Sequence, residues 1–333
     1  FAENIEPTRM YFVLAWFAVC HAAWKDTTTA LNGVNATTGN QGRELVMIRT
    51  FNPTDAMIER MARIRKELSP EREVVIAVNV PEVRGTLFTA SDVQKVLDSQ
   101  AKLKEKLPPS SMVSYTNSEI KAIFPIMEEL ELVRFAGIAW NYHDETIYIA
   151  KKKFESQYQS RTGEKWKNNG LWVLEEDVEY SGNWNELFDK YSKADFVSSH
   201  IISKSFTPPL AVKSSRKFQE RYVLEDEHDK IGYVMQTEEH LVKYSARFET
   251  LMHQLMEDGV HAHSEYGSPT IATKLGFRVE SLDEFEKWRV GNLDVRSWSR
   301  SDNHSEKGKE LMKERFEAKR SEGEGYLYHP CKW

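Results

Sequence analysis

The chain of 333 residues contains only two cysteines, Cys20 and Cys331. So few cysteines exclude a disulfide scaffold and a zinc site built from cysteine. A single bridge between the two is one alternative, but Cys20 lies within an apolar run, which favours a free buried thiol. The sequence also lacks a GxGxxG fingerprint, a Walker loop and a GxSxG elbow. These absences exclude the commonest classes of dehydrogenase, P-loop protein and serine hydrolase as the function of this chain.

An excess of basic residues is also absent, because 45 Lys and Arg stand against 51 Asp and Glu, for a formal net charge of −6. This balance argues against nucleic acid as a partner. Hydrophobic residues make up 40% of the chain and charged residues 29%, which is typical of a soluble globular protein. The length suffices for one large α/β domain or two smaller ones.

Residues 10–24, MYFVLAWFAVCHAAW, form an apolar run interrupted only by His21. The run is shorter than the ~20 residues of a membrane-spanning helix but matches the core of a signal peptide. A signal peptide, a signal anchor (residues 1–25 in either case) and a buried segment are the alternatives. Residues 26–43 are rich in Thr, Asn and Gly and predict a flexible stem. An apolar leader is thus followed by a polar stem and a globular body, and sequons occur at Asn35 and Asn303. Together these features favour a protein of the secretory pathway, either secreted or in the Golgi membrane.

The body of the chain alternates apolar runs with segments of helical periodicity. Residues 44–51 and 73–80 are short apolar runs, each followed closely by proline, and both predict buried strands. Between them, residues 55–68 carry apolar side chains at helical spacing behind Thr54, a helix cap. Continuously apolar strands separated by a helix indicate parallel pairing, with helices packed on the sheet. We therefore expect an α/β fold with a mostly parallel central sheet.

Residues 171–184, LWVLEEDVEYSGNW, place an acidic cluster at the end of an apolar strand. Several strand–helix units precede it, so the cluster falls at the carboxyl end of a central parallel strand, where open α/β sheets bind ligands. If the pleat continues, Glu176 points to one face and three acids point to the other, namely Glu175, Asp177 and Glu179. Glu175 and Asp177 can then reach one hard cation, Mg²⁺ or Mn²⁺. The alternative is a solvated loop or the first turn of a helix.

This segment resembles a motif of GT-A-type nucleotide-sugar glycosyltransferases in algae, fungi and bacteria: an apolar strand, Glu-x-Asp-Val, an aromatic residue and Ser/Thr-Gly-x-Trp. Residues 261–276, HAHSEYGSPTIATKLG, resemble a His-Ser-Glu and Pro-Thr segment on the acceptor side of such enzymes. Residues 328–332, YHPCK, resemble their terminal Tyr-His-Pro-x-Lys. The three motifs occur in the same order over residues 44–333.

The resemblance implies a metal site. In these enzymes the acidic pair stands where a DxD motif binds the cation, so Glu175 and Asp177 are the implied ligands. A C-terminal histidine completes the metal shell in several GT-A families, which makes His329 a third implied ligand. This sequence has Glu-x-Asp in place of Asp-x-Asp. It therefore stays open which of Glu175, Glu176 and Asp177 touches the metal.

The resemblance also implies an activity. It indicates a GT-A-like (Rossmann-like) catalytic domain over residues 44–333, with a C-terminal extension. Such a domain would transfer a sugar from a nucleotide-diphosphate donor to a glycan or glycoprotein, with Mn²⁺ or Mg²⁺ as cofactor. Two rival functions are a non-catalytic carbohydrate-binding module around a structural cation and a metal-dependent phosphoesterase. Whether the transfer retains or inverts the anomeric configuration stays open.

Glycosyl transfer also needs a group that deprotonates the acceptor hydroxyl. Glu265 is the first candidate for this base, because it lies in a short polar loop beside two histidines, after a predicted amphipathic helix over residues 240–256. Its alternative role is to cap the following turn. Asp195 is the second candidate, although an Asp before an apolar pair often only begins a strand.

Polar residues at the junctions between strands and helices are the candidates for binding the nucleotide. Their side chains offer hydrogen-bonding groups to base or phosphate, and ligands bind at the carboxyl ends of the strands in α/β sheets. Topology alone selects five residues, which are Arg49, Thr50, Asn52, Asn79 and Asp144.

Overall fold

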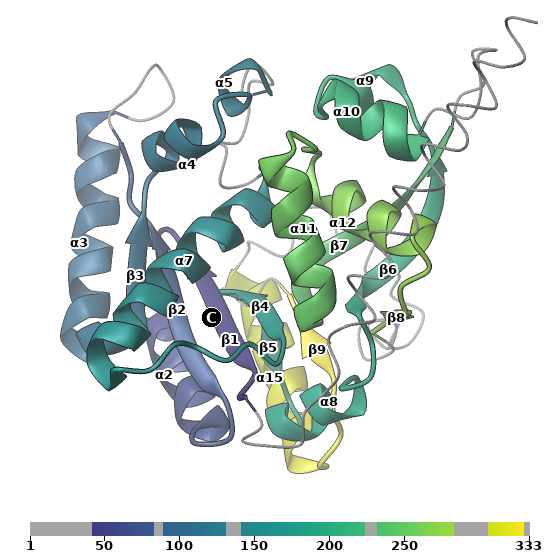
Figure 1. Ribbon diagram of the computed structural model, residues 1–333. Helices are drawn as coiled ribbons and strands as arrows, with labels where there is room; N and C mark the ends of the chain where they lie inside the picture. The colour runs from purple at the N-terminus through teal and green to yellow at the C-terminus, as the bar shows by residue number, and fades with distance from the viewer. Residues whose placement is uncertain (1–41, 83–88, 131–140, 224–231, 283–305, 330–333) are drawn as a thin grey trace, which may run out of the picture. The chain divides into compact units, whose positions relative to one another are not determined.

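The computed structural model describes residues 42–82, 89–130, 141–223, 232–282 and 306–329, which all belong to the compact unit Gly42–Trp333. At the centre of these residues is a seven-stranded sheet with the strand order β3-β2-β1-β4-β7-β6-β8 (Figure 1). Its strands are β1 (Leu45–Thr50), β2 (Glu73–Asn79), β3 (Met112–Tyr115), β4 (Leu171–Glu175), β6 (Phe196–Ser205), β7 (Tyr233–Tyr244) and β8 (Val279–Ser281).

The strands of this sheet pair mostly in parallel. β1 lies between β2 and β4 and runs parallel to both, with Ile48 opposite Ile76 on one side and Leu174 on the other. β3 is parallel to β2, and β8 is parallel to β6. β7 alone among the described strands of this sheet runs against its neighbours, between β4 and β6. The predicted α/β class with a mostly parallel sheet is confirmed.

The helices cover both faces of the sheet, which explains the unbroken apolar sequences of β1 and β4. Alternate residues of these strands enter two hydrophobic clusters, with Met47 and Val173 in one and Ile48 and Leu174 in the other. The helices are α2 (Asp55–Leu68), α3 (Ala90–Lys106), α4 (Asn117–Ile123), α5 (Met127–Leu130), α7 (His143–Thr162), α8 (Trp184–Lys190), α9 (Pro208–Ala211), α10 (Arg216–Phe218), α11 (Ala246–Glu257), α12 (Ser264–Lys274) and α15 (Glu306–Ser321). Helices α4, α7, α11 and α12 complete the first cluster, and α2, α3 and α8 complete the second.

The helix predicted over residues 240–256 is wrong in its first turn. Residues up to Tyr244 belong to β7, where Leu241 pairs with Leu174 of β4. The helix α11 begins at Ala246, because the side chain of Ser245 accepts a hydrogen bond from Phe248 N and caps it. His240 therefore lies on a strand of the central sheet.

A second, two-stranded sheet brings the end of the described chain to the acidic turn. β5 (Glu179–Tyr180) pairs with β9 (Leu327–Tyr328), with Glu179 opposite Tyr328. Leu327 is fully buried in the second hydrophobic cluster, and the ring of Phe316 packs edge-on against Tyr328. A Cβ on Gly325 would lie 2.0 Å from Tyr180 Oη. The backbone before β9 therefore approaches this tyrosine as only glycine allows.

Among the described residues, none of the helices is both long and apolar enough to cross a bilayer. The predicted leader (residues 1–25), nearly all of the predicted stem (26–43), both sequons and both cysteines lie outside the described residues.

Leu327→Asp should detach β9 from β5 while leaving the central sheet intact, because a buried charge in this position has no partner. We expect faster hydrogen exchange at the amide of Ser181, which donates to Tyr326 O at 3.0 Å, and unchanged slow exchange in β1 and β4. Leu97→Asp on the outer face of α3, where Leu97 is exposed, is the matched control. Equal protection of Ser181 in Leu327→Asp and wild type would contradict the assignment.

Candidate metal centre

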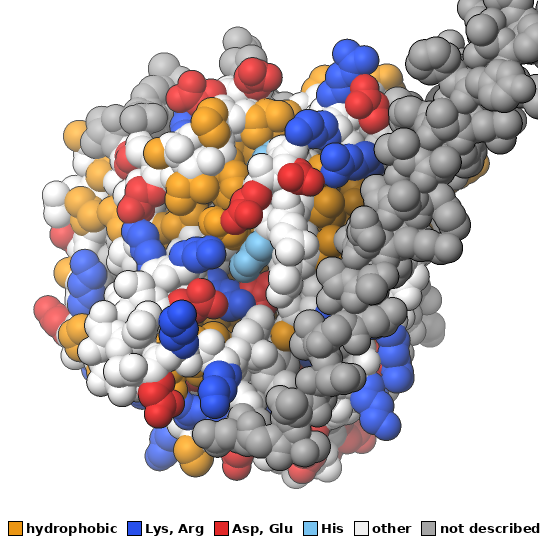
Figure 2. Space-filling view, in the orientation of Figure 1, with side chains coloured by type: hydrophobic (Ala, Val, Ile, Leu, Met, Phe, Trp, Pro, Cys, Tyr) orange, Lys and Arg blue, Asp and Glu red, His pale blue; other side chains and the backbone are white. Residues whose placement is uncertain are grey.

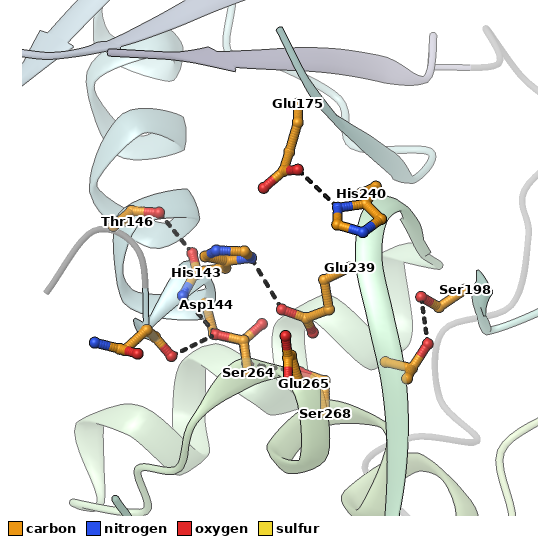
Figure 3. Close-up of polar contacts among 12 residues, drawn as sticks. His143, Asp144, Thr146, Glu175, Ser198, Glu239, His240, Ser264, Glu265 and Ser268 are labelled. Atoms are coloured by element: carbon orange, nitrogen blue, oxygen red, sulfur yellow. Dashed lines mark hydrogen bonds and ion pairs between the residues drawn. The ribbon is translucent and has the colours of Figure 1, made fainter. Parts of the chain in front are cut away.

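Glu175, the last residue of β4, is held by three side chains from other parts of the chain. Its Oε2 accepts a hydrogen bond from His240 Nδ1 at 2.8 Å and lies 3.2 Å from His329 Nε2. Its Oε1 accepts a hydrogen bond from Arg49 Nη2 at 3.2 Å. Figure 3 shows the carboxylate of Glu175 pointing toward His240 from the neighbouring strand β7. The carboxyl end of β4 is thus the meeting point predicted from the sequence.

Two histidines face this carboxylate together. The rings of His240 and His329 stack with their centroids 3.5 Å apart and their planes at 21°. His329 follows β9, and its Nε2 also lies 3.3 Å from Asp177 Oδ1. The possible ligand atoms of Glu175, His240 and His329 all lie within 4.8 Å of one another. Figure 2 shows histidine, acidic and basic side chains gathered near the middle of one face of the molecule.

Glu175 and His329 of this cluster shift each other's pKa toward the charged forms. Burial raises the pKa of Glu175, but the charges and hydrogen bonds of His240 and His329 outweigh burial and hold it well below its ordinary value. Burial lowers the pKa of His329, but hydrogen bonds and charge from Asp177 and Glu175 outweigh it and raise the pKa to about 9. Glu175 therefore stays ionised and attracts positive charge.

The residues of this cluster fit a divalent cation. The carboxylate of Glu175 and the imidazoles of His240 and His329 converge from β4, β7 and the end of β9, and the carboxylate of Asp177 lies beside His329. Imidazole is a ligand of transition metals, whereas Mg²⁺ is bound mainly by oxygen. The structure brings together the three ligands predicted from sequence, Glu175, Asp177 and His329, and adds His240. Sequence reasoning missed His240 because it placed this residue on a helix.

The other two acids of the turn have different partners. Glu176 Oε2 accepts hydrogen bonds from Thr50 Oγ1 and from Phe51 N, the latter at 3.3 Å. Glu179 does not continue the pleat of β4 as expected, because the strand ends at Glu175 and a turn follows. Glu179 instead forms a buried ion pair with Arg60 and a partly exposed one with Arg63.

Arg49 and its neighbours lie at the carboxyl ends of β1 and β2, as predicted. Arg49 Nη2 donates to Glu175 and to His143, while its Nε and Nη1 are buried without a hydrogen-bond partner among the described residues. The hydroxyl of Thr50 donates its hydrogen bond to Glu176. Asn52 is exposed and accepts a hydrogen bond from Ser99 Oγ, and Asn79 is buried and donates to Asn117. Arg49 is therefore the nucleotide-binding candidate that lies next to the cluster.

Asp144 is buried inside the molecule, which does not support its predicted contact with a nucleotide. It lies in the first turn of α7 and accepts hydrogen bonds from Tyr244 Oη at 2.9 Å and from Ser268 Oγ at 2.7 Å. Burial, together with the charge of Glu145, raises the pKa of Asp144 to about 7. Asp144 thus ties α7 to β7 and α12.

The position of Asp195 does not support its predicted role as a base. Asp195 precedes β6, and its backbone oxygen accepts from Ser245 N, just after β7. Since β7 is antiparallel to β4, this is the opposite edge of the sheet from Glu175. The carboxylate accepts hydrogen bonds from Ser245 Oγ at 2.8 Å, Arg247 Nε at 2.7 Å and Arg278 N at 3.0 Å. These contacts join β6, α11 and the segment before β8.

Glu265 lies on the same side of the sheet as two residues that sequence reasoning missed. It stands in the first turn of α12, and its Oε2 accepts a hydrogen bond from Gln236 Nε2 at 3.4 Å. Burial raises its pKa, and burial also raises the pKa of Glu239 on β7, with further contributions from the charges of Asp144 and Glu265. Glu239 Oε2 in turn lies 3.0 Å from His143 Nδ1 (Figure 3). His143 sits beside the predicted Asp144, but its neighbour on β7 is 96 positions away in sequence, so no local pattern connects them.

Comparisons with known proteins return structural matches only, since no family model and no curated protein matches the chain. One solved structure is mouse xyloside xylosyltransferase 1, at 12% identity over 76% of this chain and 91% of that chain, with a TM-score of 0.29. Core-mannan synthase A from Aspergillus fumigatus, with Mn and GDP, shows 9% identity over 74% of each chain and a TM-score of 0.31. The mannosyltransferase PcManGT from Pyrobaculum calidifontis, with GDP-Man and Mn²⁺, shows 12% identity over 82% and 65%, and a TM-score of 0.32.

Because the TM-scores are low, the fold class of this chain rests on its own sheet, and its function on the residues of the cluster.

Asp144→Asn should change how stability depends on pH. The folded chain keeps the Asp144 proton up to pH about 7, whereas an unfolded Asp releases it near pH ~3.9. The folded state is therefore penalised increasingly as the pH rises between these values. The neutral Asn escapes this penalty, so the stability of the variant relative to wild type should improve across the window. Urea unfolding at a series of pH values measures it, and a pH-independent difference would contradict the account.

Asp195→Asn should lower the free energy of unfolding by about 2 kcal/mol, because it weakens hydrogen bonds to a charged partner at a nearly buried site. Chemical denaturation measures the loss. Glu280→Gln, which removes an exposed ion pair with Arg278, is the control and should cost less than about 1 kcal/mol. A variant as stable as wild type would show that Asp195 does not join these elements.

Proposed function

We propose that this chain is a nucleotide-sugar-dependent glycosyltransferase that uses a divalent metal. One observation carries the proposal: Glu175, Asp177, His240 and His329 converge at the carboxyl end of the central strand β4. That edge is where α/β sheets bind nucleotides and their phosphates. The joint occurrence of this cluster with the HSEY and YHPCK motifs favours sugar transfer over the two rival functions.

Mn²⁺ is the cation we propose, held by the carboxylates of Glu175 and Asp177 and by the imidazoles of His240 and His329. Imidazole nitrogens favour Mn²⁺ over Mg²⁺, which prefers oxygen ligands. A bound cation would neutralise the diphosphate of the donor and stabilise the departing nucleotide. The carboxylate of Glu175 remains ionised and so is ready to bind it.

Arg49 and Glu265 take the remaining roles in this proposal. Arg49 has two nitrogens, Nε and Nη1, without a hydrogen-bond partner among the described residues, and their N–H groups are suited to a phosphate or to the nucleotide. Glu265 is the base for the acceptor hydroxyl, because burial raises its pKa toward the range in which a carboxylate can take up a proton. The acceptor we propose is a glycan or glycoprotein.

From residues 1–43 we also propose a place in the secretory pathway, either as a secreted protein or in the Golgi lumen with residues 1–25 as membrane anchor. This proposal rests on the apolar run, the stem and the sequons of the sequence.

Titration calorimetry with Mn²⁺, and then with a panel of nucleoside diphosphates in the presence of Mn²⁺, tests the proposal. We expect Mn²⁺-dependent binding of one nucleotide class in the wild type. Asp177→Asn removes the charge of one ligand and His240→Ala removes a ligand atom, so both should weaken Mn²⁺ binding at least ~10-fold. Glu238→Gln, on β7 but with an exposed side chain, is the matched control and should bind as wild type does.

Four outcomes would overturn the proposal. Absence of any nucleotide binding would remove the donor site, and unchanged Mn²⁺ affinity in Asp177→Asn and His240→Ala would remove the metal site. Glycan binding without nucleotide affinity would identify a carbohydrate-binding module. Release of phosphate from simple esters would identify a phosphoesterase.

A further inference from the structure

A chain of polar contacts connects Glu239 on β7 to the metal centre through two other elements. Glu239 Oε2 lies 3.0 Å from His143 Nδ1 at the start of α7. His143 Nε2 lies 3.0 Å from Arg49 Nη2 on β1, and the same Nη2 donates to Glu175 Oε1 at 3.2 Å. All four side chains are at most 13% exposed. The contacts therefore persist with little competition from water.

The protonation of His143 follows from its partners. A guanidinium can only donate hydrogen bonds, so the Nε2 atom that faces Arg49 must be an acceptor and carry no proton. The imidazole is then neutral with its proton on Nδ1, which is the atom that faces the carboxylate of Glu239. Glu239 Oε2 lies 3.0 Å from this Nδ1 atom, and its position favours the tautomer in which His143 accepts from Arg49.

Arg49 is fixed by this arrangement. Its Nη2 atom has two hydrogens, and Glu175 and His143 take one each. Glu175 is held at Oε1 by Arg49, while its Oε2 faces the imidazoles of His240 and His329. One oxygen of the carboxylate therefore faces Arg49 and the other faces the histidines, so the contact with Arg49 fixes the orientation of the carboxylate group.

We propose that His143 and Glu239 are positioning residues of the metal centre, which act through Arg49 to orient the carboxylate of Glu175. The inference deepens the proposed function and rests on it for the identity of the cation. Partners that orient a ligating side chain commonly contribute 10- to 100-fold to metal affinity, roughly, without touching the metal. Neither residue belongs to a sequence motif of the metal site.

His143→Leu and His143→Gln separate this role from simple packing. Leucine removes the acceptor for Arg49, so we expect Mn²⁺ affinity, measured by calorimetry with the metal alone, to fall about 10- to 100-fold. Glutamine restores an acceptor oxygen toward Arg49 and an N–H group toward Glu239, so its Mn²⁺ affinity should return to within about 3-fold of wild type. His253→Leu is the matched control, since His253 is a half-buried histidine on α11 that packs against Tyr148. It should bind Mn²⁺ as wild type does.

Thermal unfolding of each variant shows whether it is folded at the temperature of the titration. A folded His143→Leu with wild-type Mn²⁺ affinity would overturn the inference. An equal loss in His253→Leu would also overturn it, because general loosening would then explain the effect. A glutamine variant as weak as the leucine variant would show that His143 does not act by accepting from Arg49.

Nitrogen-15 NMR of the histidine rings in the metal-free wild type gives a readout that does not depend on the proposed function. The inference predicts the Nδ1–H tautomer for His143, with its signal assigned by its loss in His143→Gln. It also predicts that the signals of His240 and His329 shift in His143→Leu. If wild type binds no Mn²⁺, the proposed function fails, while this spectrum still decides the positioning role. An Nε2–H tautomer, or unshifted signals of His240 and His329, would overturn it.

Discussion

The structure depends on how negative charge is compensated at the end of a buried central strand. Ionised carboxylates are costly in a low-dielectric surrounding unless donors or cations face them. In this chain each acid of the turn is compensated by a different set of partners. Glu179 is paired with two arginines of α2, and Glu176 accepts from the end of β1. Glu175 and Asp177 face the two stacked histidines, and their charge is what makes the place suited to a metal ion.

The groups that compensate this negative charge come from distant segments of the chain, which the fold brings to one edge of the sheet. His240 arrives because β7 runs antiparallel beside β4, so that a late residue of β7 lies next to the carboxyl end of β4. His329 arrives because β9 pairs with β5 directly after the acidic turn. Arg49 arrives because β1 is the parallel neighbour of β4, with Arg49 in register with Glu175. The site is therefore a consequence of strand order, and the buried apolar strands fix that order.

The sequence predicted those features that are local. Unbroken apolar runs identified β1, β2 and β4 as buried parallel strands, and the acidic turn pointed to Glu175 and Asp177. His329 came from the family resemblance, because nothing in YHPCK indicates which strand it will meet. His240 escaped prediction because a short apolar run beside a helix fits either periodicity.

Tertiary contacts also decided the roles of residues that were singled out by type alone. Asp195 and Asp144 look like site residues in the sequence, yet hydrogen bonds from distant segments hold both of them inside the fold. His143 and Glu239 were not predicted as site residues. Their role depends on the contact between them, and no local sequence pattern indicates that contact.

Anomalous diffraction at the manganese edge, from crystals grown with Mn²⁺ and a nucleoside diphosphate, tests the central claim most directly. The account predicts one strong peak within bonding distance of the Glu175 carboxylate and the imidazoles of His240 and His329, with the diphosphate on its open side. A peak at another place, or a nucleotide bound away from the carboxyl end of β4, would contradict it.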